Sequence, residues 1–300
     1  MPRRRVPLFV PLDAVRTLAS KQVLADPGLR CAGREIAYAT RTPDGPATVV
    51  IAQRESALDV EAWGPGADLL LERLPALVGL EDVGADDFTP ASEPLRTLRR
   101  RHPGLRLPRT GAVLETLVPA VLGQQVSGKE AGRSLLRLTR ALGQPAPGPA
   151  GLDLWLPPSA ATLAGLGYEQ LHRFGVERRR ADIVREVARR HSRLEEVAAL
   201  DREAAWRRLL AIRGVGPWTA ALVMRTVRGD ADAVPLGDYN LPSLVAWNLA
   251  GERRADDRRM LELLAPHAGH RARVVQLLQV AGSAPPRRGP RLPLRAIDRS

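Results

Sequence analysis

Alternating polar and apolar residues mark the first part of the chain as strand-forming. Between residues 29 and 64, the segments REIAYAT, ATVVIAQ and LDVEAWG have the composition of half-buried strands, and the turn-prone TPDGP separates the first two. Leu69, Leu70, Leu74 and Leu77 then recur at helical spacing. The pattern predicts a small antiparallel sheet followed by a helix.

Beyond residue 90 the apolar positions follow a helical period. One continuous stripe, which ends in a polar residue, comprises Leu114, Leu117, Val118, Val121, Leu122 and Gln125. The Pro- and Gly-rich segment 143–159 predicts a surface loop. Further helices are predicted over 160–166, 168–174, 177–191, 201–212, 217–228, 241–250 and 256–264, with a last one near 270–281.

The charge of the chain favours an anionic partner. Lys and Arg number 45 against 33 Asp and Glu, a net charge of +12, and nucleic acid is the usual partner of so basic a protein. Residues 55–90 alone carry a net charge of −8, which leaves +20 on the rest and suggests that one part of the molecule faces an acidic polymer. The arginine runs 99–101 and 178–180 are predicted to be solvated faces.

The lone cysteine, Cys31, excludes an intramolecular disulfide, a thiolate zinc cluster and a four-cysteine iron–sulfur site. The N-terminal segment is interrupted by Pro7, Pro11 and Asp13, and no stretch is apolar enough for a membrane span. We therefore expect a soluble cytoplasmic protein with no cleaved signal. The basic, Pro-rich tail 283–300 is predicted to be disordered.

The segment LLAIRGVGPWTAALVMRT, residues 209–226, predicts a helix-hairpin-helix. Gly214, Val215 and Gly216 make a tight turn, and Pro217 opens the second helix, where its missing N–H costs nothing. The glycines let the backbone approach a phosphate, and the amides at the start of the second helix can bind it without reading sequence. An ordinary glycine-rich turn is the alternative, but the surrounding residues favour DNA binding.

Asp238 is the candidate acid. It lies just before or at the N-terminus of the helix predicted over 241–250, where a carboxylate is favoured in its charged form. The simplest interpretation is a helix cap. Its position about two dozen residues after the hairpin favours a role in chemistry instead.

The hairpin with its downstream Asp resembles the helix-hairpin-helix DNA glycosylases. HPGLRLPRTGAVLETLVPAVLGQQVS (102–127), IRGVGPWTA and LGDYNL are specifically similar to AlkA-type 3-methyladenine DNA glycosylases, and the resemblance runs from about residue 6 to 282. It implies an α+β, mostly α fold: a small antiparallel-sheet N-terminal domain packed on a two-lobed, all-helical core. The expected domains are 1–90, a core of 91–282 (one lobe 113–230, the other 91–112 plus 231–282), and a tail of 283–300.

The resemblance implies base excision repair of damaged double-stranded DNA, by a protein expected to be a monomer. Asp238 matches the catalytic aspartate that stabilises an oxocarbenium-like transition state. Trp218 stands where glycosylases that also cleave the backbone carry a lysine, and neither Lys21 nor Lys129 is near the hairpin in sequence, so a monofunctional enzyme is expected. No cofactor or metal is expected, and a monovalent cation at the hairpin is left open.

By the same resemblance, Trp218, Leu222 and Tyr239 line the pocket for an extruded base, although Trp218 and Leu222 could instead be core. The tryptophan that the family often carries near the C-terminus is missing, so His270 or His267 is expected to replace it or that wall to be absent. Gln125 matches the wedge that fills the gap left by the flipped base, with a solvent-exposed helix end as the alternative. The expected DNA-binding residues are Gln124, Gln125, Ser127, Arg213, Gly214, Val215, Gly216 and Thr219.

Two other functions stay open at this point. One is a related glycosylase for deaminated or oxidised bases, which an altered C-terminal wall would allow. The other is a helix-hairpin-helix DNA-binding protein without catalysis, against which Asp238 argues, because such a protein needs only the hairpin.

Overall fold

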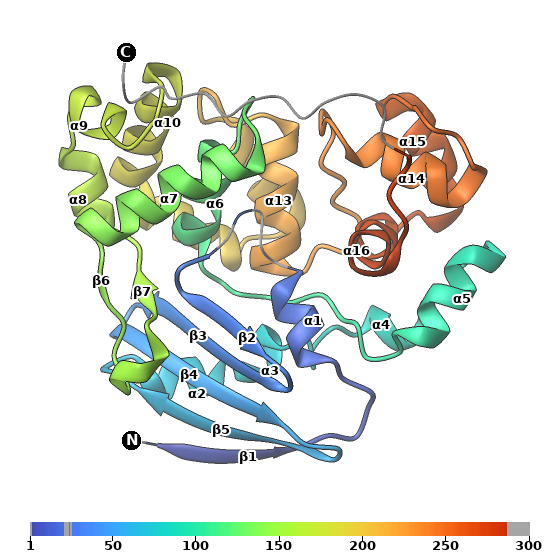
Figure 1. Cartoon of the computed structure of the whole chain (residues 1–300), viewed down its shortest axis with the longest axis horizontal. Helices are drawn as coiled ribbons and strands as arrows, with labels where there is room; N and C mark the ends of the chain where they lie inside the picture. Colours follow the sequence, from blue (N-terminus) through green and yellow to red (C-terminus); the bar gives the residue numbers. More distant parts are fainter. Residues whose placement is uncertain (1, 21–23, 25, 287–300) are drawn as a thin grey trace.

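The structure is a computed structural model that describes residues 2–20, 24 and 26–286. Its N-terminal part is a five-stranded antiparallel sheet in the order β1-β5-β4-β3-β2, which lies beneath the helices in Figure 1. The prediction of an antiparallel sheet between residues 29 and 64 is confirmed. The strands are β1 (Arg3–Pro7), β2 (Leu29–Ala32), β3 (Glu35–Thr42), β4 (Gly45–Gln53) and β5 (Ala57–Trp63).

Both faces of the sheet are covered, which explains the long buried run in β3. Ile36 and Tyr38 point to the face where helices α1 (Ala14–Ala19), α2 (Ala67–Glu72) and α3 (Leu74–Leu77) pack. Ala37 and Ala39 point to the opposite face, against Leu154 and Leu156. Alternate side chains of a strand project to opposite faces, so a strand covered on both sides is apolar throughout.

Strand β1 is not predicted by the sequence, because its residues RRRVP carry three charges and a proline. It pairs antiparallel with β5 at the edge of the sheet, with Arg3 opposite Glu61 and Arg5 opposite Asp59. Arg3 forms an ion pair with Glu61 at 3.0 Å. Cross-strand charge pairs of this kind stabilise an edge strand that lacks the usual apolar pattern.

The rest of the described chain is mainly helical, so the predicted α+β class is confirmed. These helices are α4 (Gly84–Asp87), α5 (Glu93–Arg101), α6 (Val113–Leu122), α7 (Gly128–Leu142), α8 (Ala160–Gly165), α9 (Tyr168–His172), α10 (Arg178–Arg189), α11 (His191–Glu195), α12 (Arg202–Leu210), α13 (Pro217–Arg228), α14 (Leu241–Ala250), α15 (Asp257–Leu264) and α16 (Arg271–Ala281), with 3-10 turns η1 (Ala150–Leu152), η2 (Glu196–Ala198) and η3 (Ala265–His267).

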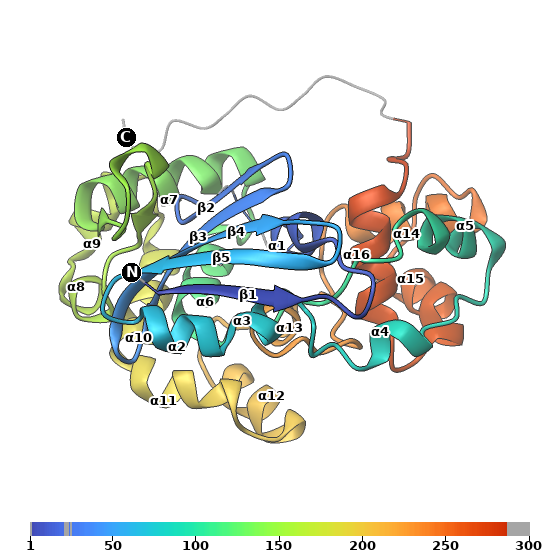
Figure 2. The same ribbon diagram turned by 90° about the horizontal axis from the view of Figure 1, so that it is seen from below.

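Two apolar clusters organise the helices. The first unites α6, α7, α10, α12 and α13, with Leu117, Val184 and Val223 at its centre. The second unites α5, α14, α15 and α16, around Val245 and Val274. Figures 1 and 2 show the two groups side by side, with the sheet under the first and α13 on the side that faces the second.

Two of the predicted segments differ from the structure. The segment 143–159 is not only a surface loop: β6 (Gln144–Pro145) pairs with β7 (Trp155–Leu156), and the buried Leu156 packs toward the sheet. The stripe that was predicted to reach Gln125 ends sooner, because α6 stops at Leu122 and Gly123 caps it. All eight helices predicted from residue 160 onward are present within about two residues of the expected ends, except 177–191, which divides into α10 and α11.

The arginine runs are solvated as predicted at Arg100, Arg101, Arg178 and Arg179, but Arg180 is buried and Arg99 is half-buried. Arg180 is only 3% exposed and donates from Nη1 to the carbonyl of Leu122 at 2.8 Å. Arg99 donates from Nη2 to the carbonyl of Ala85 at 2.7 Å. A guanidinium that donates to a carbonyl fixes the distance between two segments: Arg180 joins α10 to the end of α6, and Arg99 joins α5 to α4.

Buried polar contacts join the N-terminal part to α16. Asp82 accepts from Nη2 of Arg273 at 2.7 Å, and both side chains are buried. Arg106 donates to Asp86 at 2.6 Å, and Gln276 donates to the carbonyl of Arg106 at 2.8 Å. Part of the acidic segment 55–90 therefore serves to compensate buried arginines.

None of the helices in residues 2–20, 24 and 26–286 is long and apolar enough to cross a membrane. Most of the predicted tail, residues 287–300, lies outside the described residues. Its start does not lie free, because the backbone N–H of Ser283 donates to Asn248 at 2.9 Å.

Candidate active site

The hairpin between α12 and α13 has the tight glycine turn that the sequence predicts. Gly214 has φ +91°, and a Cβ there would lie 2.4 Å from the Cδ1 of Ile183 on α10, so only glycine fits. Gly216 is the N-cap of α13 and has no side chain with which to cap the helix, and a Cβ there would meet nothing within 4 Å. The start of α13 thus has no side-chain cap and has open space beside Gly216, as phosphate binding requires.

Asp238 is held in place by three N–H donors. Its Oδ1 accepts from the backbone amides of Asn240 and Leu241, each at 2.9 Å, so it caps α14 from just outside the helix. Its Oδ2 accepts from the indole Nε1 of Trp218 at 2.9 Å. Asp238 is half-buried. Its side chain caps α14 with one oxygen and faces Trp218 with the other, so it can be both a helix cap and a site residue.

Trp218 brings the hairpin helix, Asp238 and the end of α6 together. Its ring lies against Gly123, where an added Cβ would be 3.5 Å from the indole. Leu222, one turn further along α13, is buried. Trp218 itself is half-buried, which leaves part of its aromatic surface beside the carboxylate open to a ligand.

A buried positive charge belongs to the same site. Arg225 is 6% exposed on α13 and donates from Nη1 to Oε1 of Gln279 on α16 at 2.9 Å. Burial lowers the pKa of its guanidinium to about 10, and the attraction of Asp238 opposes that change. The buried charge of Arg225 thus contributes to the electrostatic field at Asp238 from inside the protein.

Gln124 contacts the hairpin directly, so it is not simply exposed to DNA. Its Nε2 donates to the carbonyl of Gly214 at 2.9 Å and to the hydroxyl of Thr219 at 3.0 Å. Thr219 is only 1% exposed. The hydroxyl of Thr219 is thus buried and already bonded, which leaves its backbone N–H for the predicted contact with phosphate. In the same way Val215 is buried, which leaves only its backbone for contact.

Gln125, Ser127 and Arg213 are exposed on the surface around the hairpin. Gln125 lies beyond the end of α6 with φ +58°, a left-handed conformation that is uncommon for residues with a side chain. Ser127 is the N-cap of α7 and accepts from the amide of Glu130 at 3.2 Å. Gln125 is therefore not on a helical stripe as predicted, and it projects from a turn between α6 and α7.

Two predicted pocket residues, Tyr239 and His270, are not packed against Asp238 and Trp218. Tyr239 is 95% exposed and points to solvent, although it follows Asp238 directly. His270 precedes α16 and packs on Phe88, with ring centroids 5.3 Å apart. Gln279, which contacts Arg225 near Asp238, is nine residues further along α16, or about 13 Å at the rise of an α-helix. His270 is thus separated from Asp238 by much of α16.

The other histidine considered, His267, is buried at the same end of α16 and also faces Phe88. Burial, and then the neighbouring His270, lowers the pKa of His267. A neutral histidine in an aromatic contact has the features of a core residue, not of a wall that binds an extruded base.

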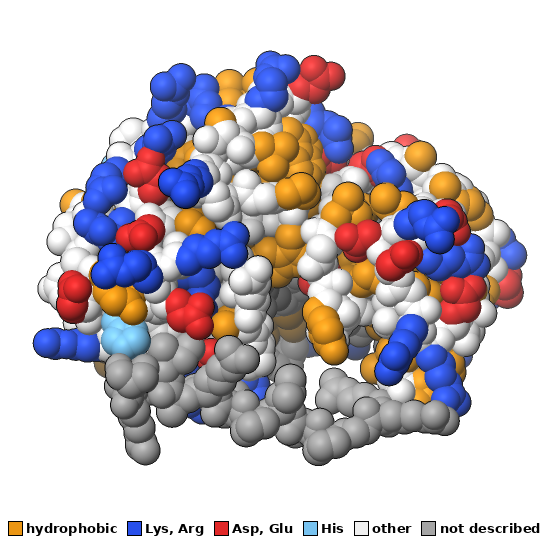
Figure 3. All heavy atoms as spheres, turned by 90° about the horizontal axis from the view of Figure 1, so that it is seen from above, with side chains coloured by type: hydrophobic (Ala, Val, Ile, Leu, Met, Phe, Trp, Pro, Cys, Tyr) orange, Lys and Arg blue, Asp and Glu red, His pale blue; other side chains and the backbone are white. Residues whose placement is uncertain are grey.

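The face of the molecule seen from above is mixed in charge. In Figure 3, which views the molecule from above, Lys and Arg side chains are spread over both helical lobes together with acidic ones, and apolar side chains are frequent in the middle of the face. No group of three His, Cys, Asp or Glu side chains is placed to hold a metal in the part of the chain that the structure describes.

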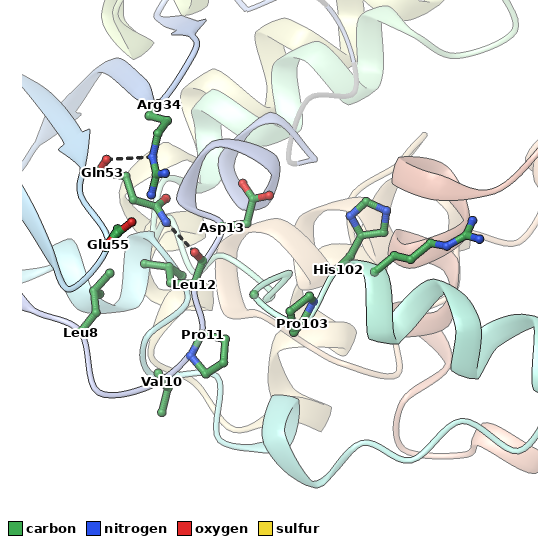
Figure 4. A pocket seen from close by; sticks show the side chains of 12 residues that line it. Leu8, Val10, Pro11, Leu12, Asp13, Arg34, Gln53, Glu55, His102 and Pro103 are labelled. Atoms are coloured by element: carbon green, nitrogen blue, oxygen red, sulfur yellow. Dashed lines mark hydrogen bonds between the residues drawn. The ribbon is translucent and has the colours of Figure 1, made fainter.

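A separate pocket of about 380 Å³ lies at the N-terminal part, away from the predicted site residues. Figure 4 shows it between the segment 8–13, the sheet and the end of α5. Gln53 donates to the carbonyl of Leu12 at 2.5 Å and its own carbonyl accepts from Arg34 at 3.1 Å. None of the residues predicted to act in DNA binding or catalysis lines it.

Sequence reasoning missed one residue of the site and one contact within it. Arg225 reads as one more arginine in a chain that contains 43, and only the structure shows that it is buried toward Asp238. The bridge from Gln124 to the hairpin joins residues 90 positions apart, and no periodicity reveals such a contact.

Comparison with known proteins gives this geometry a context. No protein-family model matches the chain. Over 181 residues, 59% of this chain, it is 35% identical to a "Probable bifunctional transcriptional activator/DNA repair enzyme AlkA" from Mycobacterium tuberculosis, of which the match covers 34%. It is 27% identical over 164 residues to the "Putative DNA-3-methyladenine glycosylase YfjP" of Bacillus subtilis, covering 53% of this chain and 55% of that protein.

Among solved structures, a 3-methyladenine DNA glycosylase from Archaeoglobus fulgidus superposes with a TM-score of 0.77 at 22% identity, covering 92% of this chain and 97% of that one. The chain spans about a third of the mycobacterial relative and about half of the Bacillus one. This protein thus has AlkA-like 3-methyladenine DNA glycosylases among its homologues, and its fold is that of the helix-hairpin-helix DNA glycosylases.

Proposed function

We propose that this protein is a monofunctional DNA glycosylase that excises alkylated purines of the 3-methyladenine type from double-stranded DNA and leaves an abasic site. The observation that carries the proposal is the hydrogen bond from Trp218 to Asp238. It holds an aromatic ring and a carboxylate together at the start of the hairpin helix. The ring would contact the base of a nucleotide, the carboxylate its sugar, and the start of the helix its phosphate. The names of the homologues point to the same activity.

Asp238 acts in this proposal by electrostatic stabilisation. As the C1′–N bond breaks, its electron pair leaves with the base and positive charge develops on the sugar. A carboxylate about 4 Å away stabilises that charge by roughly 4 kcal/mol at an effective dielectric constant of 20, close to a thousandfold in rate. Water then adds to C1′ and gives up a proton to solvent. An alkylated purine is already cationic and leaves as a neutral base, so it needs no strong general acid.

The hydrogen bonds to Asp238 support this role. Two backbone amides and one indole N–H fix the direction of the carboxylate before substrate arrives. Trp218 adds an electron-rich face on which a cationic purine can stack. The carboxylate and the aromatic ring would thus act on the two halves of the same nucleotide.

The absence of strand cleavage follows from the residue at position 218. Enzymes that cleave the backbone use a lysine amine to form a Schiff base with the sugar. Residues 209–226 contain no lysine, and the indole of Trp218 cannot form such a bond. We therefore expect an abasic product with an intact strand.

The hairpin grips the DNA backbone in this proposal. The open position at Gly216 and the uncapped amides of α13 suit a phosphate. Extrusion of the damaged base leaves a gap in the stack, and the exposed Gln125, on a turn next to the hairpin, suits its filling. A glutamine can occupy the space and hydrogen-bond the unpaired partner base.

The test is incubation of the purified protein with methylated duplex DNA, chromatography of the released bases, and analysis of strand breaks before and after hot alkali. Release of 3-methyladenine, with breaks only after alkali, is the expected result. Breaks without alkali would overturn the monofunctional assignment. If no alkylated base appears, the proposal fails, and duplexes with deaminated or oxidised bases would then separate another glycosylase from a non-catalytic DNA-binding protein.

A further inference from the structure

The turn 123–126 between α6 and α7 is attached at three points. Gln124 donates to the hairpin at the carbonyl of Gly214 and the hydroxyl of Thr219. Before the turn, the carbonyl of Leu122 accepts from the buried Arg180 at 2.8 Å. Within it, Gln125 accepts from Arg179 at 3.4 Å. The turn is therefore held from the hairpin on one side and from α10 on the other.

Helix α10 contacts the turn and the hairpin with one face. Arg179 and Arg180 reach the turn, and Ile183, three and four residues later, fills the space beside Gly214. Residues at this spacing lie on the same side of a helix. Helix α10 thus supports both the glycine turn of the hairpin and the turn 123–126 from one side, and Gln124 joins the two turns directly.

The conformation of Gln125 needs this support. Its φ of +58° is a left-handed backbone, which costs free energy for a residue with a Cβ and persists where the surroundings fix it. Its side chain is exposed, so the conformation does not serve core packing. The only polar group of this turn that enters the hairpin is the Gln124 amide, among the contacts of the described residues.

We propose that Gln124 is a positioning residue that couples the phosphate-binding hairpin to Gln125, so that gripping the backbone and filling the gap of the extruded base occur as one rigid step. The inference rests on the proposed function and deepens it. In this proposal Gln124 holds Gln125 in place relative to the hairpin and does not itself contact the reacting nucleotide. Loss of the Gln124 amide would let the turn 123–126 relax while the hairpin and Asp238 stay in place.

The test is a double-mutant cycle with Gln124→Met, which keeps the side-chain length but removes both hydrogen bonds, and Gln125→Ala. Single-turnover excision of an alkylated purine paired in duplex DNA should fall about tenfold in each single variant. In the Gln125→Ala background, Gln124→Met should cost less than about twofold, because its effect passes through Gln125. Full additivity of the two losses would overturn the proposal.

Two controls separate positioning from a general structural effect. Gln144→Met changes the same residue type at an exposed position on β6, and its excision rate should equal that of the parent. For Gln124→Met, the melting temperature and the affinity for undamaged duplex should stay near the parent values. If that affinity falls as far as excision does, Gln124 supports the hairpin itself and the coupling to Gln125 is wrong.

A second readout does not depend on excision. A duplex with an abasic-site analogue opposite 2-aminopurine reports insertion of a side chain as a change in fluorescence. We expect a change with the parent protein and its loss in both Gln124→Met and Gln125→Ala. Retention of the change in Gln124→Met refutes the coupling even if alkylated bases are excised. Its loss supports the coupling even if the parent excises no base, an outcome that would refute only the proposed function.

Discussion

The two oxygens of Asp238 have different partners, and this division reconciles its two interpretations. Oδ1 accepts from the first amides of α14, and Oδ2 accepts from Trp218 on α13. A helix cap and a candidate catalytic group usually compete as explanations for an aspartate. Here the cap fixes one oxygen so that the other is held beside the indole at the hairpin.

Replacement of Trp218 by Phe tests the indole contact. The variant keeps an aromatic face but loses the N–H that donates to Asp238. A hydrogen bond to a charged group contributes about 1.5–3 kcal/mol, so the single-turnover excision rate should fall at least about tenfold. The affinity for undamaged duplex should be unchanged. An excision rate equal to that of the parent would show that the indole N–H has no part in orienting the carboxylate.

Replacement of the two hairpin glycines by alanine should have different effects on stability and on DNA binding. Gly214→Ala places a Cβ against Ile183 at a positive φ, and should lower the free energy of unfolding by about 2–4 kcal/mol. Gly216→Ala meets open space and should cost less than about 1 kcal/mol. The methyl of Gly216→Ala stands where a phosphate would approach, so it should weaken DNA binding. Chemical denaturation and binding titrations measure both, and equal stability losses would contradict the assignment.

The sequence predicts residues well where local spacing carries the information. Asp238, Trp218 and Gly214 are identified by their places around the hairpin, and the structure brings Asp238 and Trp218 into contact. The exposure of Tyr239 is not predicted, because the direction of a side chain in a loop depends on tertiary packing. The burial of the Thr219 hydroxyl is not predicted either, because its partner Gln124 is 95 residues away.

At the scale of elements, the hairpin predicts a strong dependence of DNA binding on salt. Its contacts would go to phosphates through backbone amides and nearby arginines, and neutralised phosphates release counterions. The affinity for undamaged duplex should fall more than about tenfold between roughly 50 and 200 mM salt. Titrations at several salt concentrations measure the slope. A change of less than about twofold would show that phosphate contacts do not dominate binding.

Elements are predicted where a single period persists and missed where another interaction replaces it. The helices beyond residue 160 follow their apolar spacing. Strand β1 has no alternating apolar pattern, and ion pairs to β5 stabilise it instead. The stripe through Val121 continues the helical period to Gln125, yet α6 stops at Leu122. Arg180 donates to the carbonyl of Leu122. The last carbonyls of a helix have no partner within the helix, so a side-chain donor of this kind stabilises its end.

At the scale of the molecule, part of the acidic segment is paired inside the fold. The net charge of −8 over residues 55–90 suggests a face turned away from a polyanion. Two of its carboxylates, Asp82 and Asp86, compensate Arg273 and Arg106 where the N-terminal part meets α16. Net charge along a sequence does not reveal which charges are paired inside the fold.

This interior network predicts a large loss of stability on Asp82→Asn. The substitution leaves the buried guanidinium of Arg273 without its carboxylate partner, and breaking a buried ion pair in this way costs about 3–5 kcal/mol. Chemical denaturation should show that loss. Glu203→Gln, which removes a well-exposed partner of Arg207, is the control and should have no measurable effect. A stability near that of the parent in Asp82→Asn would mean that the network does not join the two parts.

The central claim is that the carboxylate of Asp238 promotes base excision, and Asp238→Asn tests it most directly. The asparagine Oδ1 still caps α14, but the side chain has no charge with which to stabilise a cationic sugar. On duplex DNA that contains 3-methyladenine, the single-turnover excision rate should fall about a thousandfold while the affinity for the duplex stays within about threefold. Excision at the rate of the parent protein would remove Asp238 from the chemistry and contradict the account.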